Sequence, residues 1–263
     1  MGSSLEKHLV CCFHGFLGRP SDYDFLKNQM TLSADIEWFI PDLFDWGSQH
    51  NWPHLNNYGE VFNQTLQAQF PNSQNLFNKK IFVGYSMGGR LGLHLLRYQM
   101  EQIHNKLDFC FDAFIFISTG TGLVEDQDKI SRIKDDKKWA QIFLEKPWEE
   151  ALKLWNHQGV LQNSQEPMRL EKNYNKINLG QSFEVWGLAQ QNSMVQVINH
   201  SKIPMLWLVG ERDLKYQGIY TFLHDGPNLK KIKIPNSGHR VIFDEPLTVL
   251  QIIRDCIVQL EDC

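Results

Sequence analysis

One serine of this chain stands in a setting that suits a nucleophile or a base. It is Ser86, at the centre of the segment Gly84-Tyr85-Ser86-Met87-Gly88, which fits the pattern Gly-x-Ser-x-Gly. A short apolar run at residues 80–83 precedes it and predicts a buried strand, and apolar residues at helical spacing follow it. The pattern also occurs by chance, with its serine a simple turn residue. Strand, sharp turn and helix together favour a nucleophile elbow, which exposes the serine hydroxyl at the carboxyl end of a sheet.

An acid and a histidine follow Ser86 in the chain order that such an elbow requires. Residues 203–210 predict a buried strand, and Asp213 lies just past its end. Residues 231–235 alternate like a strand, and His239 follows in the next turn. The carboxyl ends of parallel strands share one edge of a sheet, where such folds place their sites. We therefore expect His239 to act as base toward Ser86 and Asp213 to hold the imidazole in the required tautomer.

Other carboxylates compete with Asp213 for this role. Glu211, Asp244 and Asp112 also lie near the ends of predicted strands, and the chain contains ten histidines. Chain order favours Asp213 and His239, but spacing alone leaves these alternatives open.

A second apolar strand, at residues 8–13, is expected to complete the site. It runs into His14-Gly15-Phe16-Leu17-Gly18. Elbow sites stabilise developing negative charge with the backbone N–H after the serine and with another N–H after an earlier strand. Met87 is placed to supply the first and Phe16 the second. The alternative is an ordinary turn at the strand end, with His14 a structural histidine.

Composition limits the possible classes. A chain of 263 residues with 42% hydrophobic and 21% charged residues is typical of one globular domain with an insertion. The net charge of −4 gives no reason to expect nucleic-acid binding. No stretch is apolar and long enough to span a membrane, and the N-terminal residues lack a signal-peptide pattern. We expect a cytoplasmic monomer or small homo-oligomer that binds a small-molecule carboxylate and uses no metal or cofactor.

The cysteines agree with a reducing compartment. There are five, an odd number, and their spacing matches no zinc site. Three lie in apolar strand or helix patterns, so we expect reduced and mostly buried thiols. The five are Cys11, Cys12, Cys110, Cys256 and Cys263.

The order of patterns predicts an α/β fold with a mostly parallel sheet flanked by helices. From 119 to 200 strand patterns disappear, and helical patterns rich in Trp, Lys and Glu predict a helical cap inserted into a core made of residues 1–118 and 201–263. The other expected elements are a helix at 21–31, a strand at 36–40, an aromatic loop with Trp46 and Trp52, helices at 56–70 and 86–102, a strand at 111–117 and a final helix at 245–260.

Cationic residues near Ser86, Asp213 and His239 in the expected fold indicate which substrates the site could bind. Arg90 lies one helical turn after Ser86 on the same face and would suit a substrate carboxylate. The alternative is an arginine that binds a main-chain carbonyl or pairs with an acid. Lys215 is a second candidate cation, although a solvated loop lysine is the simpler interpretation. In the cap, Arg132 and Trp155 are candidates to face the cleft, with core packing favoured for the tryptophan.

Several segments resemble a family of menaquinone-pathway synthases within the α/β-hydrolase superfamily, the enzymes that make 2-succinyl-6-hydroxy-2,4-cyclohexadiene-1-carboxylate. The similarity covers most of the chain. It is carried by residues 84–90, by residues 14–18, by the cap segment 139–147 and by the Gly-Glu-Arg-Asp-Leu-Lys segment at 210–215. The resemblance implies a triad of Ser86, Asp213 and His239. It implies substrate contacts from Tyr85, Arg90, Arg132, Trp155 and Lys215.

Two positions depart from that family. Many relatives carry Asp-x-Pro-Gly-x-Gly-x-Ser where this chain has residues 41–48, Pro-Asp-Leu-Phe-Asp-Trp-Gly-Ser. Asn156 follows Trp155 where a tyrosine is expected. The sequence therefore does not determine the shape of the pocket.

Three functions are compatible with these residues. The resemblance implies a lyase that eliminates pyruvate from a succinyl-enolpyruvyl-cyclohexene carboxylate, with the triad acting as base. The residues alone equally allow a serine carboxylesterase or thioesterase that works through an acyl-enzyme. The third reading is a binding module with a relic triad, which the complete set of catalytic residues disfavours.

Overall fold

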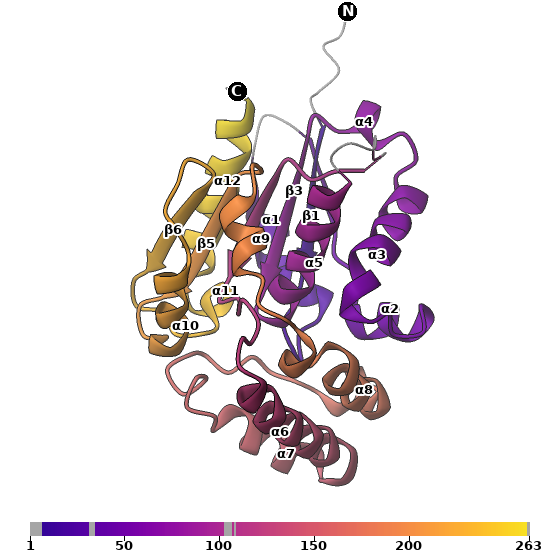
Figure 1. The fold of residues 1–263 in the computed structure, drawn as a ribbon, viewed down its shortest axis with the longest axis vertical. Helices are drawn as coiled ribbons and strands as arrows, with labels where there is room; N and C mark the ends of the chain where they lie inside the picture. The colour runs from indigo at the N-terminus through magenta and orange to yellow at the C-terminus, as the bar shows by residue number, and fades with distance from the viewer. Residues whose placement is uncertain (1–6, 32–34, 103–106, 108, 262–263) are drawn as a thin grey trace, which may run out of the picture.

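In the described part of the chain, the fold is built on one sheet of six parallel strands (Figure 1). The computed structural model describes residues 7–31, 35–102, 107 and 109–261. The strand order is β2-β1-β3-β4-β5-β6, and each described pairing is parallel, which confirms the predicted α/β class. The strands are β1 Lys7–Phe13, β2 Asp35–Phe39, β3 Lys79–Tyr85, β4 Ala113–Ile117, β5 Met205–Gly210 and β6 Leu229–Ile234.

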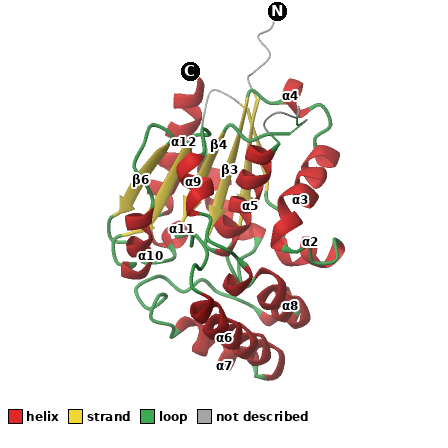
Figure 2. Cartoon of the chain, viewed as in Figure 1, coloured by secondary structure: helices red, strands yellow, loops and turns green. Residues whose placement is uncertain are grey.

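Strand β4 is apolar and buried at every position because helices cover both faces of the sheet (Figure 2). Successive residues of a strand point to opposite faces. In β1, Leu9 and Cys11 pack into the core shared with α3 Leu55–Gln69 and α5 Met87–Glu101. Val10 and Cys12 pack into the core shared with α1 Asp24–Gln29 and α12 Pro246–Glu261.

The cap consists of α6 Asp126–Glu145, α7 Trp148–Asn156 and α8 Lys176–Trp186, and it lies beyond the carboxyl edge of the sheet (Figure 1). Helix α8 contacts α2 Leu43–Gln49 of the core, and α9 Val195–His200 packs back against α5. The other described helices are α4 Ser73–Leu76, α10 Leu214–Ile219 and α11 Val241–Asp244, with 3-10 turns at Pro20–Tyr23, Glu171–Asn173, Leu188–Gln190 and Tyr220–Phe222.

The prediction of an aromatic loop after the second strand was wrong for residues 43–49, which form α2. Asp42 caps this helix and accepts hydrogen bonds from the backbone N–H groups of Phe44 and Asp45, at 3.1 and 3.3 Å. Gly47 weakens the helical pattern in the sequence. A Cβ at this position would lie 2.6 Å from the ring of Trp186, so close packing against the cap requires the glycine.

Other boundaries shift by a few residues. Strand β4 begins at 113 rather than 111, and the helix expected at 21–31 is a 3-10 turn followed by the short α1. Helices α4 and α10 were not predicted.

The described cysteines have free thiols. Cys11, Cys12 and Cys256 are buried and Cys110 is partly buried, while Cys263 lies outside the described residues, as do residues 1–6. In the part of the chain that the structure describes, no helix combines the length and the apolar character needed to cross a membrane.

Candidate active site

Ser86 occupies a strained turn between β3 and α5. Its φ of 51° and ψ of −110° are unusual for a residue with a side chain. The turn is tight enough to require glycine at Gly88, where a Cβ would lie 2.3 Å from the carbonyl oxygen of Phe13. The local geometry is that of the elbow predicted from the sequence.

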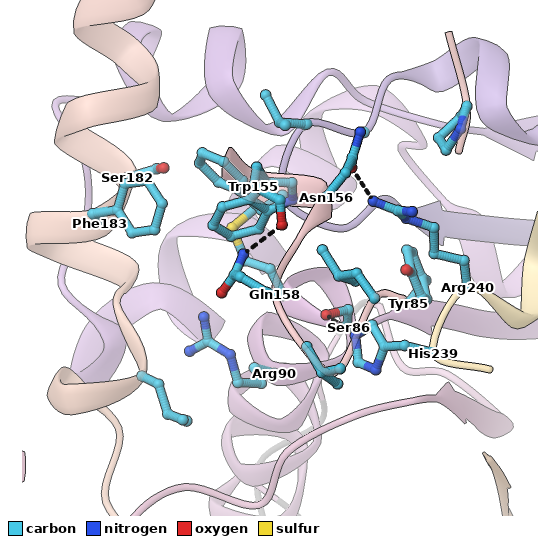
Figure 3. Close-up of a pocket in the computed structure, with 18 of the residues that line it drawn as sticks. Tyr85, Ser86, Arg90, Trp155, Asn156, Gln158, Ser182, Phe183, His239 and Arg240 are labelled. Carbon is cyan, nitrogen blue, oxygen red and sulfur yellow. Dashed lines mark hydrogen bonds between the residues drawn. The ribbon is translucent and has the colours of Figure 1, made fainter. Parts of the chain in front are cut away.

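The fold brings Ser86, His239 and Asp213 together from three different strand ends. Figure 3 shows Ser86 beside His239. The Oγ of Ser86 lies 3.0 Å from Nε2 of His239. Nδ1 of His239 lies 2.7 Å from Oδ2 of Asp213. When Nδ1–H donates to this carboxylate, Nε2 is left to accept the serine proton, which is the arrangement of a general base. His239 and Asp213 are both buried.

The alternative acids lie elsewhere. Oε2 of Glu211 accepts from the backbone N–H of Asn236. Asp244 accepts from the backbone N–H groups of Gly238 and Gln165, at 2.8 and 2.7 Å, and so braces the loop that carries the histidine. Asp112 is bound to the backbone N–H of Lys80 at the amino end of the sheet. Among these carboxylates, Asp213 is the one hydrogen-bonded to the imidazole of His239.

Phe16 and Met87, the two residues expected to bind a developing negative charge, line the same cavity as Ser86. A Cβ on Gly15 would lie 3.4 Å from Cβ of Ser86, so the turn after β1 passes directly beside it. Met87 is the first residue of α5, and the first N–H groups of a helix have no partner within it. Within the described chain, no backbone or side-chain acceptor is recorded for the N–H of Phe16 or Met87. These observations are compatible with the predicted role of the two N–H groups, which stays a prediction.

His14 has a structural role, as the alternative interpretation held. Its ring is fully buried, Nδ1–H donates to the carbonyl of Gly15 at 2.9 Å, and Nε2 accepts from the backbone N–H of Leu43, also at 2.9 Å. These bonds link the turn that carries Phe16 to the start of α2. Burial lowers the pKa of His14, which favours the neutral ring that this pair of bonds needs.

A cavity of about 140 Å³ opens above the triad, between core and cap. The five residues expected to contact substrate all line it, from both sides: Tyr85, Arg90, Arg132, Trp155 and Lys215. Aromatic rings from both parts close its walls, among them Phe16, which packs on Trp155 with ring centroids 4.6 Å apart. Trp155 therefore serves core packing and the pocket wall together, so the two interpretations of this residue were not exclusive.

The charge of the pocket wall is wholly positive. Five cations line it, Arg90, Arg132, Arg169, Lys215 and Arg240, whereas no described Asp or Glu does. Two of them are paired outside the cavity. Arg169 holds Asp22 with two bonds of 2.6 and 2.8 Å, and Nε of Arg132 donates to Asp136 at 2.8 Å.

Arg90 combines both roles considered for it. It donates to the carbonyl of Trp186 at 2.8 Å and to Oε1 of Gln191 at 3.2 Å, and it also lines the cavity. Burial and the nearby Arg132 lower the pKa of Arg90 to about 10. The side chain therefore stays charged at neutral pH, with no carboxylate bonded to it among the described residues.

Lys215 is exposed at the mouth of the cavity. Partial desolvation and the charge of Arg132 lower its pKa.

Two further cations of the pocket wall, Arg169 and Arg240, were not predicted from the sequence. Arg169 lies in an irregular segment with no motif around it, while the position of Arg240 directly after His239 was an available signal.

No protein-family model matches the chain, whereas individual proteins resemble it over nearly its whole length. A Haemophilus influenzae protein provisionally named 2-succinyl-6-hydroxy-2,4-cyclohexadiene-1-carboxylate synthase is 28% identical over 257 residues, covering 95% of this chain and 98% of the relative. The synthase of that name from Pectobacterium atrosepticum is 28% identical over 252 residues, covering 93% and 92%.

Solved structures show the same fold. MenH from S. aureus superposes with a TM-score of 0.77 and 18% identity, over 98% of this chain and 96% of that chain. A thermophilic esterase from Thermogutta terrifontis superposes with a TM-score of 0.61 and 18% identity, over 98% and 91%. The chain is therefore an enzyme of the α/β-hydrolase fold, and it resembles the 2-succinyl-6-hydroxy-2,4-cyclohexadiene-1-carboxylate synthases over nearly its whole length.

Proposed function

We propose that this protein is a lyase that eliminates pyruvate from the succinyl-enolpyruvyl-cyclohexene carboxylate intermediate of menaquinone biosynthesis. The observation that carries the proposal is the cation-lined pocket around Ser86, which has no described carboxylate in its wall. This substrate has carboxylates on its succinyl chain, on its ring and on its enolpyruvyl group. Charge-assisted bonds to such groups are the strong ones, and arginine suits them best. The similarity to the synthases supports the same substrate class.

In this mechanism His239 removes the hydroxyl proton of Ser86 while Asp213 stabilises the imidazolium. The serine oxygen takes a proton from the cyclohexene ring. The electrons of that C–H bond form a new ring double bond, the double bond already in the ring shifts by one position, and the C–O bond to the enolpyruvyl group breaks with its electron pair on the leaving oxygen. The N–H groups of Phe16 and Met87 stabilise negative charge that develops on a substrate oxygen. The leaving group is enolpyruvate, which becomes pyruvate when its methylene carbon takes a proton, and the proton held by the imidazolium of His239 balances this step and restores the base. The residues named need no metal or cofactor for these steps.

The alternative is a carboxylesterase or thioesterase. The same three residues and the same two N–H groups would serve an acyl-enzyme mechanism with Ser86 as nucleophile. A simple neutral ester, however, would bring no negative charge to Arg90, whose bonds to Trp186 and Gln191 go to neutral acceptors. The two proposals differ in what is released and in what becomes attached to Ser86.

The test is to mix the purified protein with the enolpyruvyl ring substrate and to follow pyruvate together with the ultraviolet absorbance of the cyclohexadiene product. We expect both to appear in equal amounts, with no covalent adduct on Ser86 by mass spectrometry. A stoichiometric acyl-enzyme burst with simple esters, fast ester turnover and no pyruvate would reject the lyase and support the esterase.

Arg90→Ala should lower kcat/KM for the ring substrate by about ten- to a hundredfold, because it removes a charge-assisted contact of about 1.5–3 kcal/mol. Turnover of an uncharged ester, where it exists, should change little. The matched control is Arg97→Ala on the same helix, since Arg97 also binds main-chain carbonyls, those of Leu55 and Asn56, but lies outside the cavity. Equal losses in the two variants would assign Arg90 a structural role only.

A further inference from the structure

Arg240 is a buried cation of the pocket wall with no assigned role. Its side chain belongs to a residue only 5% exposed, directly after His239. No ion pair to a carboxylate is recorded for it among the described residues. A buried charge is costly unless it is paired and hydrogen-bonded. An anion that enters the pocket would supply the missing pair.

The guanidinium is held in a fixed orientation by the cap. Nη1 donates to the carbonyl of Gln165 at 3.2 Å, and Nη2 donates to Oδ1 of Asn156 (Figure 3). The amide of Asn156 is itself oriented, because its Nδ2 donates to Oε2 of Glu166 at 3.1 Å. Arginine can only donate, so it must bond the amide oxygen of Asn156, while the carboxylate of Glu166 can only accept and must bond the amide nitrogen. Both bonds therefore require the same orientation of the amide.

Donors remain for a ligand. A guanidinium has five N–H groups, and the recorded bonds within the described chain use one on each of Nη1 and Nη2. In the view of Figure 3, Ser86 lies between Arg90 and Arg240, and both arginines line the same cavity. The two charges come from different elements, α5 and the loop after β6.

We propose that Arg240 binds a carboxylate of the substrate on the side of Ser86 away from Arg90, and that Asn156 positions its guanidinium for this contact. The proposal deepens the function proposed above and rests on it for the identity of the substrate. Asn156 occupies the position where the resemblance leads one to expect a tyrosine, so the Asn156–Arg240 pair is a specificity feature carried by this chain's own residues.

The test measures binding, independently of turnover, with tricarballylate as a tricarboxylate probe and tryptophan fluorescence as the signal. We expect Arg240→Gln to lower the affinity for the probe by about ten- to a hundredfold, the range expected for the loss of one charge-assisted contact. The affinity of Arg240→Lys for the probe should lie between those of Arg240→Gln and the unmodified protein, because lysine keeps the charge but lacks the planar guanidinium. Asn156→Ala should also weaken binding, by less than Arg240→Gln. The control is Arg212→Gln, an exposed arginine outside the cavity, which should bind like the unmodified protein.

A second readout separates substrate contact from mere support of the loop that carries His239. The rate at which an uncharged fluorophosphonate labels Ser86 should be the same in Arg240→Gln and in the unmodified protein, and the ring substrate should show a raised KM with little change in kcat. Unchanged probe affinity in Arg240→Gln, slowed labelling of Ser86, or no binding of tricarballylate by the unmodified protein would overturn the proposal. Failure of the lyase function is distinguishable, because the protein would then bind tricarballylate through Arg240 and release no pyruvate.

Discussion

Replacing Ser86 by alanine should lower kcat for pyruvate release by about 10⁴-fold or more, the scale seen when one member of a serine triad is removed. Oγ of Ser86 is the atom 3.0 Å from Nε2 of His239, and alanine leaves the base with no group through which to act. The side chain is small and lies at a turn, so the fold should survive. The measurement is kcat from the initial rate, together with the thermal unfolding midpoint of each variant.

The chain offers a matched control for this change. Ser182 also lines the cavity, but its hydroxyl donates to the carbonyl of Leu179 within α8 at 2.8 Å. Ser182→Ala should therefore keep kcat within a few-fold of the unmodified protein. Near-normal turnover by a folded Ser86→Ala variant would remove the triad from both the lyase and the esterase mechanisms.

Asp213→Asn should slow the reaction by about 10⁴-fold, the size reported for the equivalent change in a serine triad. The side-chain amide of asparagine can donate to Nδ1 of His239, and this favours the tautomer that carries its proton on Nε2. A protonated Nε2 cannot accept the hydroxyl proton of Ser86. The change is nearly isosteric, and Asp213 is buried, so the loss should appear in kcat and not in gross misfolding.

Asp244→Asn is the comparison, because Asp244 is a carboxylate in the same region that binds main-chain N–H groups and not the imidazole. It should lower stability and leave kcat within about tenfold, the reduced effect of a residue outside the triad. If Asp244→Asn alone abolished turnover, the acid of the site would have been misassigned.

The parts of the site that could be predicted are those set by short-range pattern. The elbow at Ser86 is a strand, a turn and a helix that are adjacent in sequence, so its glycines and apolar runs predict it directly. Asp213 and His239 each follow a strand, and parallel strands end at one edge, so their meeting could be anticipated. Chain order favoured Asp213 over Asp244, because Asp244 follows the histidine. Choosing between Asp213 and Glu211 needed the side-chain directions, because both follow the same strand.

The remaining features were decided by contacts between segments far apart in the chain. Helix α2 looked like a loop because Gly47 weakens its pattern, and that glycine is explained only by the ring of Trp186 from the cap. Arg169 reaches Asp22 across 147 residues, and Arg240 reaches Asn156 across 84. Their segments carry no periodicity that marks a pocket wall. The sequence alone thus determined the fold class and the candidate catalytic groups, since these depend on local periodicity and strand order. Only the docking of the cap on the sheet decided which cations face Ser86, because burial and pairing of a charge depend on what packs around it.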